Sequence, residues 1–162
     1  MATLVLLASS VGIGMGTASS LDRLSDRGEA ASSVRGAVEG ARDRLANQAC
    51  VGILDEFRDA SGQSLRTKLD ALSLTPAAYL DHLVFYDASV EGHCRASKVL
   101  AMTVPGSRAV FVCGDRFVKA RRQDPRYAEV VLIHEALHSL GLGENPPSSA
   151  AITARVLARC GR

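Results

Sequence analysis

An apolar run with helical periodicity carries two histidines four residues apart, and this run most constrains the fold. Between Tyr127 and Leu140 the apolar residues recur at the helical period, which predicts a strongly apolar helix that begins near Pro125. His134 and His138 then lie on one face of this helix, one turn apart. A helix this apolar belongs in a protein core, so both imidazoles are expected to be embedded there.

Two glutamates complete the pattern. Glu135 follows the first histidine and points beside the pair, where a metal-bound water molecule would lie. A catalytic zinc ion usually takes three protein ligands and leaves a fourth position for water. After His138 the chain has no further histidine or aspartate, and Glu144 is its only carboxylate residue. Gly141 is expected to end the helix in the left-handed conformation and so return Glu144 toward the ion.

The spacing HExxHxxGxxE over residues 134–144 resembles the metzincin zinc-peptidase signature HExxHxxGxxH. The resemblance implies a zincin-type metallopeptidase in which Zn2+ is bound by His134, His138 and Glu144. It also implies that Glu135 is the general base, which takes a proton from water and then protonates the leaving amine. Glutamate stands at the place of the third histidine, and no methionine follows Met102, so the metzincin Met-turn has no counterpart. A compact zincin relative therefore fits better than a standard metzincin.

The predicted function is that of an exported zinc metallopeptidase with a peptide or protein substrate. Two alternatives remain open at this point: an exported domain whose metal site is non-catalytic and which binds a partner, and a zinc amidase that acts on cell-envelope substrates. The donor that would stabilise the transition state is also open, with His93, Tyr127 and Arg116 as candidates. His82 and His93 lie outside any ligand spacing and are expected to be surface or structural residues.

Residues 1–20 have the shape of a signal peptide. The apolar stretch from Leu4 to Met15 is too short to span a membrane, and Gly16-Thr17-Ala18 offers small residues where a signal peptidase reads them. We therefore expect a mature protein that begins near Ser19, is secreted or periplasmic, and has no stable membrane span. The alternative is an N-terminus that is disordered or packed in the core.

Four cysteines, none close enough to another to form a CxxC pair, favour two disulfides in an exported small domain. The pairing that we prefer joins Cys94 with Cys113, on neighbouring strands, and Cys50 with Cys160, which ties an early helix to the last one. Buried free thiols are the alternative.

Length and charge limit the remaining classes. With 162 residues the chain has the size of one domain, which we place at residues 21–162 and expect to be a monomer. A net charge of +2 is too small to indicate a nucleic-acid partner. The densest basic stretch reads as the solvent-exposed start of a helix; it contains Lys119, Arg121, Arg122 and Arg126.

The remaining patterns predict an α+β, zincin-like fold with leading helices, a small and mostly antiparallel sheet, the HExxH helix and a C-terminal helix. Residues 21–49 read as a polar helix or a partly ordered lead-in, and 50–69 and 75–80 as short helices. Strands are expected at 83–86, 99–104 and 109–113, with a surface loop at 87–98 and a hairpin turn at 105–108. Strand 109–113 is the candidate edge strand for an extended substrate. The last helix starts at Ser148 or Ser149 and ends at Cys160.

Overall fold

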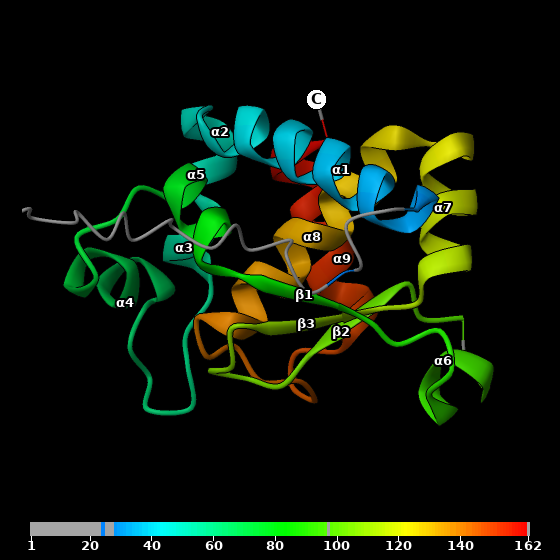
Figure 1. Ribbon diagram of the computed structural model, residues 1–162. Helices are drawn as coiled ribbons and strands as arrows, with labels where there is room; N and C mark the ends of the chain where they lie inside the picture. The colour runs from blue at the N-terminus through cyan, green and yellow to red at the C-terminus, as the bar shows by residue number, and fades with distance from the viewer. Residues whose placement is uncertain (1–23, 25–27, 97, 162) are drawn as a thin grey trace, which may run out of the picture.

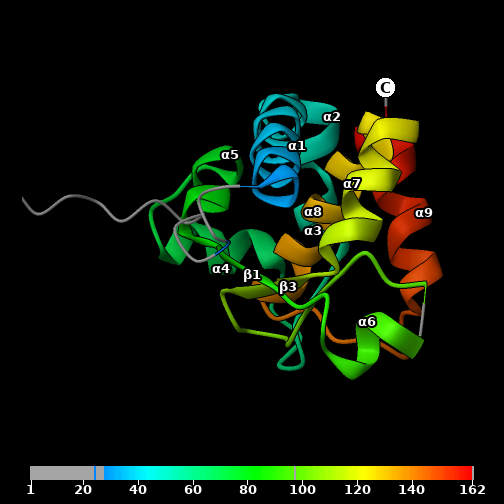
Figure 2. The same ribbon diagram turned by 45° about the vertical axis from the view of Figure 1, so that its right-hand side comes forward.

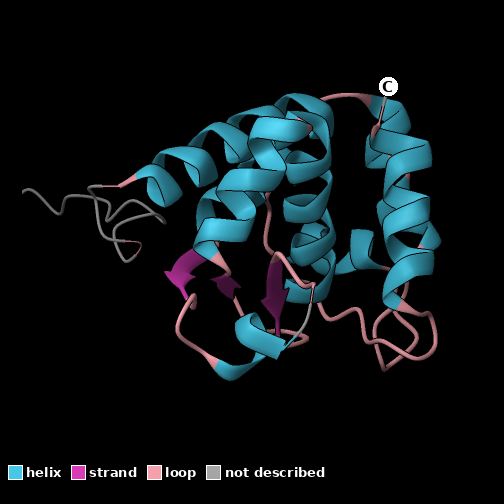
Figure 3. Ribbon diagram, turned by 90° about the vertical axis from the view of Figure 1, so that its right-hand side faces the viewer, coloured by secondary structure: helices cyan, strands magenta, loops and turns pink. Residues whose placement is uncertain are grey.

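The computed structural model describes residue 24 and residues 28–96 and 98–161; the predicted signal segment at residues 1–20 lies outside the described residues. The fold is α+β, as predicted, with a three-stranded sheet along one side of the helices (Figures 1 and 3). In chain order the elements are α1 (Glu29–Leu45), α2 (Gln48–Val51), α3 (Ile53–Glu56), α4 (Leu65–Ala71), α5 (Pro76–Tyr79), the 3-10 helix η1 (Leu80–His82), β1 (Val84–Asp87), α6 (Gly92–Ala96), β2 (Ala101–Thr103), β3 (Ala109–Val112), α7 (Gly114–Gln123), α8 (Pro125–Ser139) and α9 (Ser149–Cys160).

Helix α8 is the centre of the fold. Every residue from Val130 to Ser139 is buried, because α1, α7, α9 and β2 all pack against this helix (Figures 1 and 2). Its start follows the sequence signals: Asp124 accepts a hydrogen bond from the Tyr127 amide, and Pro125 occupies the first turn. The predicted apolar helix is confirmed, and its histidines are buried as expected.

Helix α1 contributes more to the core than its polar composition indicates. Small residues along one face, such as Ala37 and Ala41, are fully buried and let α1 approach α7 and α8 closely. A Cβ atom at Gly40 would lie 2.4 Å from a carboxylate oxygen of Glu129 on α8, so any larger residue here would displace the Glu129 side chain. The prediction of a polar helix or loose lead-in was therefore incomplete: alanines do not stand out as an apolar stripe, yet they line the interface.

The sheet is mixed, which corrects the prediction of a mostly antiparallel one. The strand order is β1-β3-β2, with β1 parallel to β3 and β2 antiparallel to β3. The antiparallel pair is the hairpin predicted around residues 105–108. Strand β1 pairs with β3 and not with β2, which follows it in the chain. The connection through α6 crosses from β1 to the opposite edge of the sheet, where β2 lies, and the hairpin then places β3 between the two. As a result, β3 is the middle strand, and the prediction of residues 109–113 as the edge strand was wrong.

Two helices were missed. The predicted surface loop at residues 87–98 contains α6, and the segment after β3 forms α7. Each buries few large side chains, with Phe117 the main one on α7, so neither has a clear apolar period. Of the predicted solvent-exposed basic stretch, Lys119, Arg121 and Arg122 lie on α7, and Arg122 forms an ion pair with Glu29 of α1.

The other predicted helices are present. Short helices α2, α3 and α4 fall within residues 50–69 and its margins, and α5 begins where Thr75 accepts a hydrogen bond from the Ala78 amide. In the same way Ser148 caps α9 by accepting from the Ala151 amide, and α9 ends at Cys160.

Both predicted disulfides are formed. Cys50 on α2 is bonded to Cys160 at the end of α9, and Cys94 is bonded to Cys113. Cys94 lies on α6 and not on a strand, so the second disulfide holds the α6 connection against the end of β3. Within the described part of the chain, no helix is long and apolar enough to cross a bilayer.

Candidate metal centre

Three predicted ligand residues come together at the C-terminal end of α8. The Nε2 atoms of His134 and His138 lie 2.9 Å apart, and Glu144 Oε1 lies 3.8 Å and 3.2 Å from them, respectively. Both histidines are buried, whereas Glu144 is 38% exposed at the side chain and closes the cluster from the solvent side. The three side chains form a cluster that can hold a metal ion.

The turn after α8 brings Glu144 into the cluster. The amides of Gly141 and Leu142 donate to the carbonyls of His138 and Leu137, respectively, which is the pairing of a Schellman motif. Gly141 has the positive φ of 109° that this motif requires, as the sequence predicted. Leu142 is buried at the start of the reversed chain, and Glu144 follows it two residues later. A helix that continued past Gly141 would carry Glu144 away from the histidines.

The other ring nitrogen of each histidine, Nδ1, also has a hydrogen-bond partner. His138 Nδ1 lies 2.7 Å from the Leu142 carbonyl oxygen, which is part of the same turn. His134 Nδ1 lies 2.9 Å from Thr153 Oγ1 on α9. These contacts aim both Nε2 atoms at one point. Second partners of this kind orient ligand rings in metal sites and raise their basicity.

Burial keeps His134 neutral. The surrounding core lowers the pKa of His134 to about 4, mainly by desolvation and secondly by the repulsion of a charged His138, while Glu144 acts weakly in the opposite direction. At neutral pH the ring therefore offers a lone pair, which a metal ligand requires.

Glu135 lies beside the cluster and is only 5% exposed. Desolvation raises its pKa to about 7; Thr103 on β2 acts in the opposite direction, and the charge of Glu144 adds to the increase. Glu135 Oε2 and Thr103 Oγ1 are both buried and without a hydrogen-bond partner among the described residues. A buried carboxylate with one unpartnered oxygen and a pKa near neutrality suits proton transfer, because both of its protonation states are accessible.

A cleft of about 510 Å³ opens over the cluster. The cleft is lined by the ligand-bearing face of α8, by β2 with Val99 and Pro105, and by Glu144 and Ser149. A second hollow of about 270 Å³ is also lined by Tyr127 and Thr153. The two hollows share Val99, Ala101, His134, Glu135 and Ser149 and are together called the groove.

The edge of the sheet borders this groove. The Leu100 carbonyl, just before β2, accepts a hydrogen bond from the Cys113 amide at 2.9 Å, so in the register of this pair Met102 is the residue of β2 whose backbone faces β3. The backbone N–H and C=O groups of Ala101 and Thr103 consequently point away from β3, to the side where no described strand pairs with β2; both residues are buried. This corrects the assignment of the edge to residues 109–113: the strand beside the cluster is β2.

The three candidate donors for a transition state are separated by the fold. Tyr127 lines the groove, whereas His93 on α6 and Arg116 on α7 do not. The sequence analysis missed Thr103 and Thr153, because a lone threonine on a strand or helix carries no spacing signal. Their proximity to Glu135 and His134 depends on how β2 and α9 pack on α8.

Comparison of the chain with protein-family models, with curated proteins and with solved structures found no match. The fold and the cluster therefore define the protein only as an α+β, disulfide-bonded domain with a candidate metal centre.

Proposed function

We propose that this chain is an exported zinc-dependent metallopeptidase with a compact zincin-like fold. The observation that carries the proposal is the convergence of His134, His138 and Glu144 on one point with the buried Glu135 beside them. A structural metal site would not need a buried carboxylate that is not a ligand at its side.

The donor set fits a catalytic zinc ion. Zinc binds imidazole nitrogen and carboxylate oxygen at about 2.0–2.1 Å, so tetrahedral ligands lie roughly 3.3 Å apart. The three distances between ligand atoms, 2.9, 3.2 and 3.8 Å, bracket this separation. With three protein ligands, a catalytic zinc ion would keep a fourth position for water or substrate. A bound zinc ion supplies Lewis acidity, which polarises a substrate carbonyl and makes water more acidic.

Glu135 performs the proton transfers. Its buried carboxylate accepts a proton from the attacking water molecule. It then gives the proton to the departing amine. Thr103 lines the same cleft, where its buried hydroxyl can hydrogen-bond to the Glu135 carboxylate or to the substrate backbone.

Strand β2 holds the substrate. An extended peptide in the groove can add to the open edge of the sheet through the backbone groups of Ala101 and Thr103. Such pairing fixes the main chain of the peptide and leaves its side chains to the hollows on either side. The substrate is accordingly a peptide segment that is unfolded or accessible enough to become extended.

The two disulfides support the exported location. Disulfides form and persist in oxidising compartments, and all four cysteines of the chain are paired.

The test has two readings, metal content and peptide cleavage. Purified protein is expected to contain about one equivalent of zinc and to cleave an unstructured protein such as denatured casein. Glu135→Gln should retain the zinc and lose about 100-fold or more of the cleavage rate, since general-base catalysis is commonly worth that much. Protein without bound zinc would refute the metal centre. Zinc with no cleavage, or cleavage unchanged in Glu135→Gln, would refute the peptidase; a wild type that binds zinc and cleaves non-peptide amides alone would indicate an amidase.

A further inference from the structure

Helix α9 reaches the candidate metal centre through one side chain. Thr153 Oγ1 lies 2.9 Å from His134 Nδ1, on the side of the ring away from the other ligands. The hydroxyl group of Thr153 can both donate and accept a hydrogen bond. The Leu142 carbonyl, which is the corresponding partner of His138, can only accept one.

The hydrogen positions follow from these partners. His138 Nδ1 faces the Leu142 carbonyl at 2.7 Å, so this nitrogen carries a proton, and in the neutral ring His138 Nε2 has a lone pair. His134 Nε2 lies 2.9 Å from His138 Nε2. With both rings neutral, two lone pairs cannot face each other at this distance, so the space between the rings holds either a proton on His134 Nε2 or a metal ion.

These two states require opposite tautomers of His134. With the proton on Nε2, His134 Nδ1 has a lone pair and accepts a hydrogen bond from the Thr153 hydroxyl. With a metal ion on Nε2, the proton is on Nδ1, and the ring donates to the same hydroxyl. The net charge of His134 is unchanged: the proton displaced from Nε2 goes to solvent, and solvent supplies, through the hydroxyl, the proton that binds Nδ1.

We propose that Thr153 is a positioning residue that satisfies His134 in both tautomers, so that the centre takes up and loses its metal ion without rotation of the ring. This inference rests on the proposed metal centre and extends it to α9. A valine at this position would have nearly the same shape but would leave Nδ1 without a partner in either state. A serine would retain the hydroxyl.

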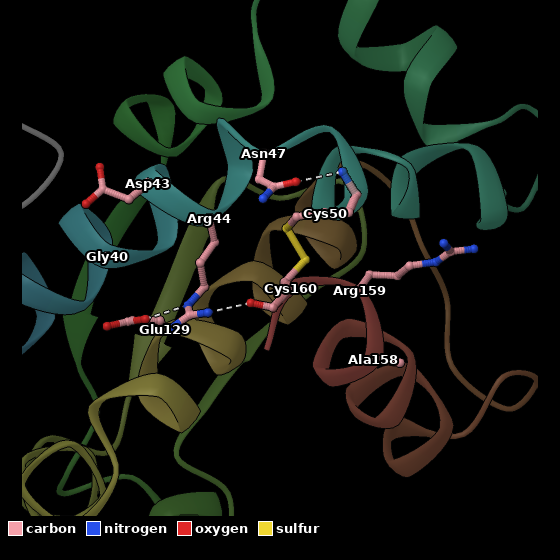
Figure 4. Close-up of a pocket in the computed structure, with 10 residues that line it drawn as sticks. Gly40, Asp43, Arg44, Asn47, Cys50, Glu129, Ala158, Arg159 and Cys160 are labelled. Carbon is pink, nitrogen blue, oxygen red and sulfur yellow. Dashed lines mark hydrogen bonds and ion pairs between the residues drawn. A yellow bond between two sulfur atoms is a disulfide. The ribbon is translucent and has the colours of Figure 1, made fainter. Parts of the chain in front are cut away.

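The position of Thr153 is fixed by contacts along α9. The C-terminal end of α9 is joined to α2 by the Cys50–Cys160 disulfide. The Arg44 side chain of α1 donates hydrogen bonds of 2.5 Å to the Cys160 carbonyl and to the Glu129 carboxylate of α8 (Figure 4). In the middle of the helix Ile152 and Val156 are fully buried. The hydroxyl is therefore held in place by the packing of the helix and does not depend on the metal ion.

Zinc affinity, measured by competition with a chromophoric chelator, tests the role of Thr153. Thr153→Val is expected to weaken zinc binding about 10- to 100-fold, the usual effect of losing a second partner of a ligand histidine, whereas Thr153→Ser should stay within about threefold of the wild type. Ser139→Ala is the matched control: it removes a buried hydroxyl from the same helix as the histidines, one that hydrogen-bonds to Tyr79 and touches no ligand, and zinc affinity should not change. Circular dichroism confirms that each variant is folded.

Nitrogen-15 chemical shifts of the imidazoles test the exchange of tautomers directly. In the wild type, His134 should be protonated at Nε2 in the metal-free protein and at Nδ1 in the zinc-bound protein, while His138 stays protonated at Nδ1 in both. The same tautomer of His134 in both states, or equal zinc affinity of Thr153→Val and the wild type, would overturn the inference and leave the proposed function intact. A wild type that binds no zinc would instead remove the proposed function, and this inference with it.

Discussion

Replacing Glu135 by glutamine should change how the stability of the zinc-free protein depends on pH. Desolvation raises the folded-state pKa of Glu135 to about 7, from an ordinary value of 4.5. In the folded state the carboxyl group thus binds its proton more tightly than in the unfolded chain. The contribution of Glu135 to stability is fully present below pH 4.5 and is lost as the pH rises through 7. Glutamine does not titrate and lacks this loss.

The size of the effect follows from the two pKa values. The gap between them corresponds to roughly 3 kcal/mol for a fully expressed shift, of which about 2.5 kcal/mol falls between pH 5 and pH 8. The free energy of unfolding of Glu135→Gln, taken relative to the wild type, should therefore increase by up to this amount over that interval. Any constant cost of the amide cancels, because only the change with pH is compared.

The assay is urea denaturation followed by circular dichroism at several pH values, with a chelator present throughout. His134, whose lowered pKa gives the opposite slope, is common to both proteins and drops out of the difference. Added zinc should make the difference in unfolding free energy between Glu135→Gln and the wild type less dependent on pH. The reason is that a neighbouring cation favours the ionised carboxylate of Glu135. A difference between Glu135→Gln and the wild type that stays constant from pH 5 to pH 8 would refute the reasoning that burial has raised this pKa.

Three further predictions concern the third ligand, the disulfides and the turn. Glu144→Ala should weaken zinc binding by more than the roughly 10–100-fold cost of a lost second partner, and Asn145→Ala should not; equal losses in a titration with zinc would remove Glu144 from the ligand set. Replacing both cysteines of Cys50–Cys160 by alanine should lower the unfolding free energy by about 5 kcal/mol, and the same change at Cys94–Cys113 should lower it by about 3 kcal/mol. The difference arises because the first disulfide closes a loop with a sequence separation of 110 residues, whereas that of the second is 19. Denaturation curves that reverse this order would contradict the loop-length argument. Gly141→Ala should lower stability by roughly 1–2 kcal/mol and weaken zinc binding, because alanine is strained at a φ of 109°; unchanged affinity would show that the turn does not position Glu144.

The metal cluster was predictable because its geometry is local. His134, Glu135 and His138 lie on one helix, and the helix was readable from its apolar period. Glu144 comes from a turn whose conformation depends on Gly141, three residues earlier, so a short stretch of chain contains the complete ligand set. The predicted cysteine pairings were also formed, although the sequence alone left three pairings possible.

The features that the sequence did not reveal depend on contacts between distant segments. The edge position of β2 depends on which side of the hairpin β1 joins, and no local pattern specifies this. Thr153 reaches His134 only because α9 packs alongside α8. Likewise, the buried face of α1 consists of alanines, whose contribution comes from close approach rather than from hydrophobic bulk.

The bond between Cys50 and Cys160 makes residues 50–160 a covalent ring, and every group assigned to the metal centre and its groove lies within it. A proteolytic cut at an exposed loop in this ring, such as residues 60–63 between α3 and α4, leaves two pieces that are still joined. The nicked protein should run as one band on a gel without reductant and as two bands with it. The three candidate ligand residues remain on covalently joined pieces of chain. A single cut in this ring therefore leaves both halves of the candidate metal centre on one covalently joined molecule.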